Sequence, residues 1–188
     1  MNLFYLLLLG PASFVLISLI LGLITPGYDW ENDYISELVL GKYGWVQKLN
    51  FFFCGVSIIG LCVLLAGRTT ILLVKVGWYT GSLMGILILL AGVWDTDVKR
   101  ETRTLAGRLH DWIYHMGILG TGMAYILIGW GYRNFPIVFI FSWTVATFNL
   151  IWWNFSGKLG IKQGIGQRTV IYSALMWIEV MAIWTMWQ

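Results

Sequence analysis

The chain has 188 residues, of which 59% are hydrophobic and 11% are charged, and its formal net charge at pH 7 is +3. Soluble globular domains carry about 25% charged residues, so this composition, with a mean hydropathy of +0.76, excludes an ordinary soluble domain. Charged residues are grouped in short segments between apolar runs of about 20 residues, the length that crosses a bilayer. The sequence therefore predicts an all-α polytopic membrane protein.

Six apolar runs account for nearly the whole chain, which predicts one transmembrane domain of six helices. The predicted spans cover residues 3–25, 49–67, 76–94, 109–132, 135–155 and 169–187. No basic residue precedes the first run, and the run is too long for a signal-peptide core, so we expect a retained helix. Pro26 and Gly27 end it, because proline interrupts helical hydrogen bonding and glycine allows a turn.

An even number of spans places both termini on one side of the membrane and the first, third and fifth loops on the other. These three loops hold most of the basic residues, so the positive-inside rule would place them in the cytoplasm, with the protein in the cell membrane. Nearly all the acidic residues and both histidines lie on the same side. The main partner expected is the lipid bilayer, and no nucleic-acid partner is expected.

The first loop contains the segment "DYISELVL", whose apolar and polar residues separate onto two sides of a helix. The apolar side would hold Tyr34, Ile35, Leu38 and Val39, and the polar side would hold Asp33, Ser36 and Glu37. This pattern predicts a short interfacial helix that acts as a lid over the bundle. Alternatively, its carboxylates only cap the helix and pair with Arg108 or Arg168.

The third span contains Gly77, Gly81 and Gly85 in the spacing GxxxGxxxG. Glycines at this spacing clear one helix face and let a neighbouring backbone approach closely. We therefore expect tight packing of the third helix, without any implication for activity.

The fourth span begins with "HDWIYHMG", in which His110 and His115 are five residues apart. This separation is about 140° around a helix, so the two rings cannot face one ion from the same side. A single divalent metal could still be held by one histidine with loop carboxylates, for which His110, Asp97 and Asp33 are the candidates. The alternative is a histidine that forms interfacial hydrogen bonds.

Two other cofactors are disfavoured by the sequence. A haem held across two helices needs histidines on different spans, and both histidines of this chain lie on the fourth. Retinal needs a lysine near the middle of a span for its Schiff base, and no predicted span has one.

Glu179 lies roughly ten residues into the last predicted span, near the bilayer midplane. An ionised carboxylate is costly there, so an acidic residue is a functional candidate. It could end a hydrogen-bonded chain that starts from His115, or it could be a protonated side chain that joins two helices.

The motifs "PGYDWENDYISEL", "GKYGWVQKLNFFFCG", "WDTD", "TLAGRLH" and "GIGQR" occur in this order along the chain. In this arrangement the sequence resembles the family of multi-pass membrane proteins called domain of unknown function 998. The resemblance implies a helical membrane bundle with its polar motifs on one side, and it implies no particular reaction. Asp97 corresponds to the family aspartate in "WDTD", whereas Asp95 is an additional acid.

Two classes of function remain open at this stage. The first is a small membrane enzyme or binder that acts on a lipid-like ligand. Its candidate site residues are Asp33, Ser36, Glu37, Asp97, His110 and Arg168. The second is a non-catalytic accessory or scaffold subunit, with a membrane protein partner or a second copy of the chain. A proton-coupled carrier that uses Glu179 is a further alternative.

Overall fold

The computed structural model describes residues 2–97 and 104–188, and within them the chain forms six α-helices and one short 3-10 helix. The elements are α1 (Asn2–Ile24), η1 (Ile35–Leu40), α2 (Gly44–Arg68), α3 (Leu72–Val93), α4 (Leu105–Gly131), α5 (Pro136–Phe155) and α6 (Gln163–Met186). All six α-helices are long and apolar enough to cross a membrane. The prediction of a six-helix membrane protein is therefore confirmed.

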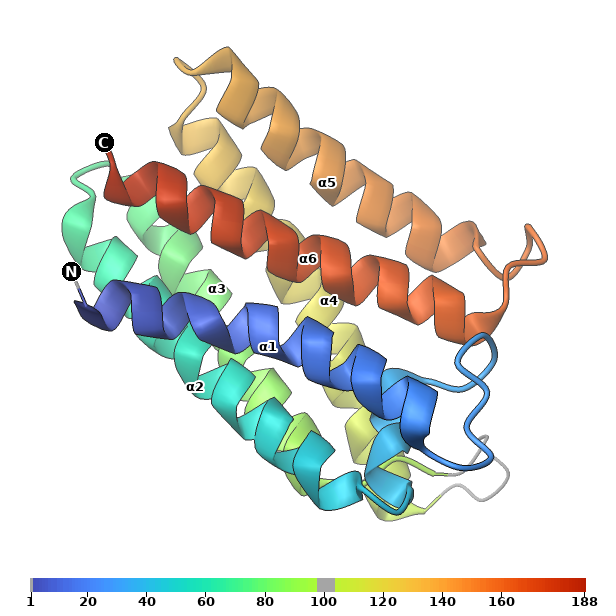
Figure 1. The fold of residues 1–188 in the computed structure, drawn as a ribbon. Helices are drawn as coiled ribbons and strands as arrows, with labels where there is room; N and C mark the ends of the chain where they lie inside the picture. The colour runs from blue at the N-terminus through green and yellow to red at the C-terminus, as the bar shows by residue number, and fades with distance from the viewer. Residues whose placement is uncertain (1, 98–103) are drawn as a thin grey trace.

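The six helices form a closed ring in which consecutive helices are neighbours (Figure 1). The last helix, α6, lies between α1 and α5 and also contacts α2. Short connections between α2 and α3 and between α4 and α5 enforce antiparallel neighbours. A ring of this kind lets each helix bury one stripe inward and expose the rest to lipid.

Four helices begin before the apolar spans predicted from the sequence. The starts of α2, α3, α4 and α6 are Gly44, Leu72, Leu105 and Gln163, each four to six residues earlier. The added first turns contain polar residues such as Lys48, Arg108 and Gln167, which hydropathy assigns to loops. Helical hydrogen bonds do not end where the hydrocarbon ends, so the helices continue into the polar region.

The predicted close packing of α3 is confirmed at each of the three glycines. A Cβ on Gly85 would lie 2.7 Å from the carbonyl oxygen of Gly55 on α2, and one on Gly77 would lie 2.5 Å from Ile128 on α4. At Gly81 a Cβ would be 3.2 Å from the sulfur of Cys62. The glycine stripe thus lets α3 fit between α2 and α4.

Figure 1 shows the first and fifth loops, the end of α3 and the start of α4 together at one end of the bundle, with the C-terminus and the start of α1 at the other. Gly27 turns the chain after α1 with φ 76°, a conformation that glycine adopts without steric cost. The segment after this turn contains a short helix, as predicted, but its extent and its buried side differ from the prediction. Only Ile35–Leu40 is helical, in a 3-10 conformation, and Asp33 precedes it. Ser36, expected on the polar side, is buried with 5% exposed.

Candidate functional site

The first loop folds over the start of α6, where it encloses the side chain of Arg168. This residue is 4% exposed. Its guanidinium donates hydrogen bonds to the carbonyl oxygens of Trp30 and Asp33, the latter at 3.0 Å, and to the Tyr28 hydroxyl. The Tyr28 and Trp30 rings lie 5.5 and 5.4 Å from its central carbon. Carbonyl dipoles and aromatic faces therefore surround the buried charge.

The carboxylate of Asp33 has a different partner from the one expected. Its Oδ2 accepts the backbone N–H of Asp29 at 2.8 Å, which closes a tight turn in the loop. Asp33 is joined to Arg168 through its carbonyl oxygen and not through its charge. Asp33 and Arg168 are thus neighbours, as predicted, in an arrangement that shapes the loop.

Gly164 permits this close approach of the loop to α6. A Cβ at this position would lie 2.5 Å from the Asp33 carbonyl oxygen and 2.7 Å from a guanidinium nitrogen of Arg168. Real Cβ contacts of that length do not occur without displacement of the neighbouring atoms. The first glycine of "GIGQR" is therefore required by the loop that it touches.

Further contacts attach the same loop to the start of α6 and to Lys162 just before it. The backbone N–H of Ile35 donates to Oε1 of Gln167 at 2.8 Å, and the Tyr34 hydroxyl donates to Oε1 of Gln163 at 2.6 Å. At the surface, Lys162 forms an ion pair with Glu31. This partner raises the pKa of the Lys162 ammonium above its ordinary value. The motifs "PGYDWENDYISEL" and "GIGQR" thus form one contact region.

The motif T-x-x-G-x-x-H organises the start of α4. The Thr104 side chain accepts the backbone N–H of Gly107 at 3.0 Å and so caps the helix. Asp97 in turn accepts the Thr104 hydroxyl at 2.7 Å and its backbone N–H at 3.0 Å. Gly107 leaves room for this carboxylate, because a Cβ there would lie 2.0 Å from Oδ2 of Asp97. Asp97 therefore completes a helix cap.

One turn further along α4, His110 faces the end of α3. Its Nδ1 lies 2.8 Å from the carbonyl oxygen of Trp94. That oxygen can only accept, so Nδ1 carries the hydrogen and the neutral ring keeps Nε2 as an acceptor. The ring is 6% exposed and also borders an internal cavity. His110 thus joins α3 to α4 on the wall of the cavity.

The cavity lies inside the ring of helices, toward the end where the loops gather. It contains roughly 870 Å³ of space free of protein atoms, its open side included. Most of its wall is apolar, with residues such as Phe14, Leu87 and Leu175. No Asp, Glu, Lys or Arg side chain lines it among the residues that the structure describes.

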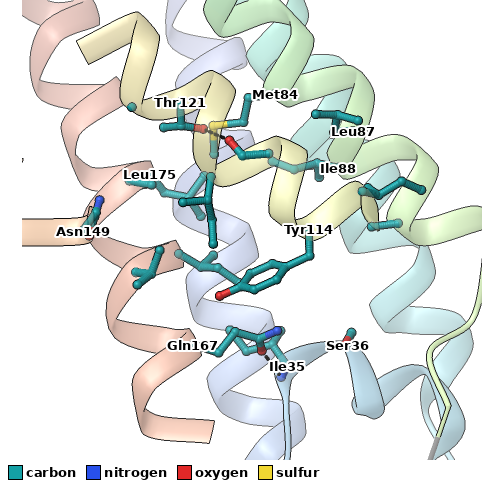
Figure 2. A pocket seen from close by; sticks show the side chains of 18 of the residues that line it. Ile35, Ser36, Met84, Leu87, Ile88, Tyr114, Thr121, Asn149, Gln167 and Leu175 are labelled. Carbon is teal, nitrogen blue, oxygen red and sulfur yellow. Dashed lines mark hydrogen bonds between the residues drawn. The ribbon is translucent and has the colours of Figure 1, made fainter. Parts of the chain in front are cut away.

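The polar side chains of the cavity come from four elements. They are Ser36 of η1, His110, Tyr114, Thr121 and Tyr125 of α4, Asn149 of α5 and Gln167 of α6. Figure 2 shows Tyr114 reaching into the space from α4, with Gln167 bonded to Ile35 at the loop end and Thr121 at the opposite end. The inner end is closed by Tyr125, whose ring lies 4.2 Å from that of Trp177.

The predicted site residues therefore fall into two groups, those that line the cavity and those that do not. Ser36 and His110 line the cavity, whereas Asp33, Glu37, Asp97 and Arg168 do not. Sequence reasoning missed Tyr114, Tyr125 and Gln167 as lining residues. Gln167 could have been noticed because it directly precedes Arg168, but the two tyrosines look like ordinary aromatic residues of a membrane span.

The hypothesis of a divalent metal stays a prediction. Among residues 2–97 and 104–188, no group of three or more His, Cys, Asp and Glu side chains converges on one point. Of the three candidate ligands, Asp97 is engaged with the start of α4 and Asp33 with the backbone of Asp29. His110 keeps an acceptor nitrogen, as described above.

The two intramembrane candidates lie apart from the cavity. His115 bonds through Nδ1 to the Asp111 carbonyl oxygen at 2.6 Å, and its ring packs 5.3 Å from that of Trp153 on α5. Glu179 is partly buried and lies near Ala12 of α1 and Cys54 of α2. Its use by a proton carrier stays a prediction.

The comparison with known families agrees with the resemblance noted in the sequence. The family described as "Protein of unknown function (DUF998)" matches residues 8–184. No curated protein and no solved structure matches the chain. The motifs discussed above lie inside the matched region, so the contacts between them belong to the part that the family shares.

Proposed function

This chain belongs to the DUF998 family, and we propose from its cavity that it binds a single uncharged amphiphile within the membrane. The polar end of the ligand would lie beside Ser36, His110 and Gln167, at the loop end. Its apolar chain would extend inward between α4 and α6. The cell membrane is the membrane in which we expect this to occur.

The observation that carries the proposal is the character of the cavity wall. Ligand sites are typically apolar cavities with a few polar groups that fix orientation. Here the wall is mainly apolar, and its described residues include no formal charge. A charged head group inside it would lose hydration without gaining an opposite charge, which disfavours such ligands. An alcohol or a monoacylglycerol avoids this loss.

The cavity lining extends along α4 for most of the thickness of the hydrocarbon core. The lining residues of α4 run from His110 to Tyr125, which at 1.5 Å per residue is about 22 Å. The hydrocarbon core of a bilayer is about 30 Å thick. A ligand aligned with α4 would therefore keep its head at the loop end and its chain among apolar side chains.

Glycines of α4 give a direct test with a matched control. Gly117 and Gly122 line the cavity, and Gly120 of the same helix does not. A Cβ on any of the three would meet nothing within 4 Å. Leucine at 117 or 122 would fill cavity space, whereas leucine at 120 would not. All three changes also replace glycine by a better helix former.

The experiment measures binding of monostearoylglycerol to full-length protein in detergent, by native mass spectrometry and by the shift in thermal unfolding. We expect binding to the unchanged protein and to Gly120→Leu, and loss of binding in Gly117→Leu and Gly122→Leu. Equal binding by all four proteins would refute the site, and no binding by the unchanged protein would refute the proposal.

An enzyme that acts on the bound amphiphile is an extension of the same proposal. Ser36 and His110 lie on the wall of one cavity, so both can contact the polar end of a ligand. In that case Ser36→Ala and His110→Ala would each abolish the hydrolysis of monostearoylglycerol by water to stearate and glycerol, which Gly120→Leu would retain. If the unchanged protein releases no glycerol, or if both variants release it at the same rate as the unchanged protein, the enzyme extension is refuted and only the binding function stands.

A non-catalytic accessory or scaffold subunit is the second candidate. It is favoured by the engagement of Asp33, Asp97 and Arg168 in contacts that hold loops and helix ends together. Chemical cross-linking in native membranes would then capture a membrane protein partner or a second copy. A chain that remains uncross-linked while it binds monostearoylglycerol would favour the first candidate.

A further inference from the structure

The inner end of the cavity contains a polar group that the first proposal does not use. Tyr125 is fully buried, and its hydroxyl has no hydrogen-bond partner among the residues that the structure describes. A buried polar group without a partner costs roughly 1–3 kcal/mol, so such groups are rare. An unsatisfied hydroxyl on the wall of a cavity is a reason to expect a ligand atom there.

The buried hydroxyl of Tyr125 lies near the side chain of Asn149. It is close enough to the Asn149 side chain to interact with it, although the geometry falls short of a hydrogen bond. Asn149 is on α5, the helix next to α4, and both residues line the cavity. The space next to the two side chains is therefore part of the ligand volume.

Asn149 adds a second donor at the same place. Its amide oxygen accepts the Ser173 hydroxyl at 2.7 Å, a hydroxyl that the Val170 carbonyl oxygen shares at 3.0 Å. With the oxygen engaged on α6, the NH₂ group is the part of the amide left to donate. The phenol of Tyr125 and the amide of Asn149 are thus two neighbouring groups that can donate to one acceptor.

We infer that the ligand carries a neutral acceptor oxygen, a keto or hydroxyl group, partway along its apolar chain. This inference rests on the proposed function and specifies the class of amphiphile that the cavity selects. The acceptor would lie between Tyr125 and Asn149, inward from the polar end held at Gln167. On α6, Trp177 at the level of Tyr125 is ten residues from Gln167, which is about 15 Å.

The preference for an oxygenated chain would come from the cost of burying the Tyr125 hydroxyl without a hydrogen-bond partner. A plain hydrocarbon chain would fill the cavity and leave the Tyr125 hydroxyl without a partner, whereas an oxygenated chain would satisfy it. Sites built to hydrogen-bond a ligand oxygen discriminate strongly against the analogue that lacks it. The selection therefore depends on one hydroxyl of the protein.

The test compares monostearoylglycerol with a series of hydroxystearoyl and oxostearoyl monoglycerides that carry the oxygen at successive chain positions. Full-length protein in detergent is titrated with each probe, and dissociation constants are measured by native mass spectrometry. We expect at least about tenfold tighter binding of the oxygenated probes at one best position. Tyr125→Phe should abolish this preference, so that the plain and the oxygenated probes bind this variant with equal affinity.

The control is Tyr132→Phe, which also removes a buried hydroxyl near the end of α4. Tyr132 donates to the Thr185 hydroxyl at 3.4 Å and does not line the cavity. The Tyr132→Phe variant should keep the full preference for the oxygenated probes. Tyr125→Phe should also fold, since it deletes only a group without a partner, and the ligand-free protein should be at least as stable to heat.

The outcomes separate the two proposals. Equal affinity for plain and oxygenated probes in the unchanged protein would overturn this inference while the proposed function stands. A preference that survives Tyr125→Phe would also overturn it. If no probe of either kind binds, the proposed function fails, and the inference fails with it.

Discussion

Oε1 of Gln167 accepts the backbone N–H of Ile35 at 2.8 Å, and both residues line the internal cavity. This bond joins the loop after α1 to the start of α6 across 132 residues of sequence. It lies where η1 forms the loop-end wall of the cavity. The contact therefore links the fold of the first loop to the proposed binding site.

Replacing Gln167 by methionine should destabilise the protein. Methionine keeps the length of the side chain but cannot accept the Ile35 N–H, which would be left buried without a partner at a cost of about 1–3 kcal/mol. The measurement is thermal unfolding in detergent. Gln163→Met is the control, because Gln163 is exposed where it bonds Tyr34. Similar losses in both variants would argue against a special role for the buried bond.

Gly164→Ala should displace the first loop. The added methyl group would lie 2.5 Å from the Asp33 carbonyl oxygen, and overpacking of this kind costs roughly 1–3 kcal/mol. Limited proteolysis of residues 26–34 should accelerate together with a drop in the unfolding temperature. Gly157→Ala, in the loop before α6, meets nothing within 4 Å and should change neither quantity.

Asp97→Ala distinguishes a helix cap from a metal ligand. Removing the carboxylate takes away both contacts to Thr104, and loss of a cap costs about 1 kcal/mol. We expect a lower unfolding temperature and the same metal content by elemental analysis of the purified protein. A bound divalent metal that disappears in both Asp97→Ala and His110→Ala would instead support the metal hypothesis.

Stability should fall with rising pH above about 10, partly because of Tyr28. Burial raises the pKa of its phenol well above the ordinary value, although Arg168 opposes the shift. Between the unfolded pKa of about 10 and the higher folded pKa, only the unfolded state loses the proton, so unfolding becomes easier as pH rises. Denaturant unfolding at pH 8 to 11 measures how the free energy of unfolding of the unchanged protein and of Tyr28→Phe depends on pH.

Tyr28→Phe should show a shallower loss of stability above pH 10. It should also be less stable at pH 8, since the Arg168 guanidinium loses one acceptor. An identical pH dependence in the two proteins would show that Tyr28 does not contribute. Other tyrosines and lysines titrate in both, so the comparison isolates the one phenol.

The amino-acid sequence by itself determined the six helices, their alternation across the membrane and the close packing of α3. Runs of apolar residues and the glycine spacing carry this information, because lipid requires each backbone to satisfy its own hydrogen bonds. The sequence also brought the polar motifs to one end of the bundle. This followed from counting spans and required no knowledge of contacts.

Only the tertiary structure decided what the polar motifs do. The pattern of Asp33, Ser36 and Glu37 predicted a polar face toward water or a cation, but amphipathic patterns do not say which groups of the protein lie opposite. Arg168 binds backbone carbonyls of the loop, and Ser36 turns to the cavity. The sequence does not indicate that Tyr125 and Gln167 line a cavity, because the cavity is formed by helices that are distant from one another along the chain.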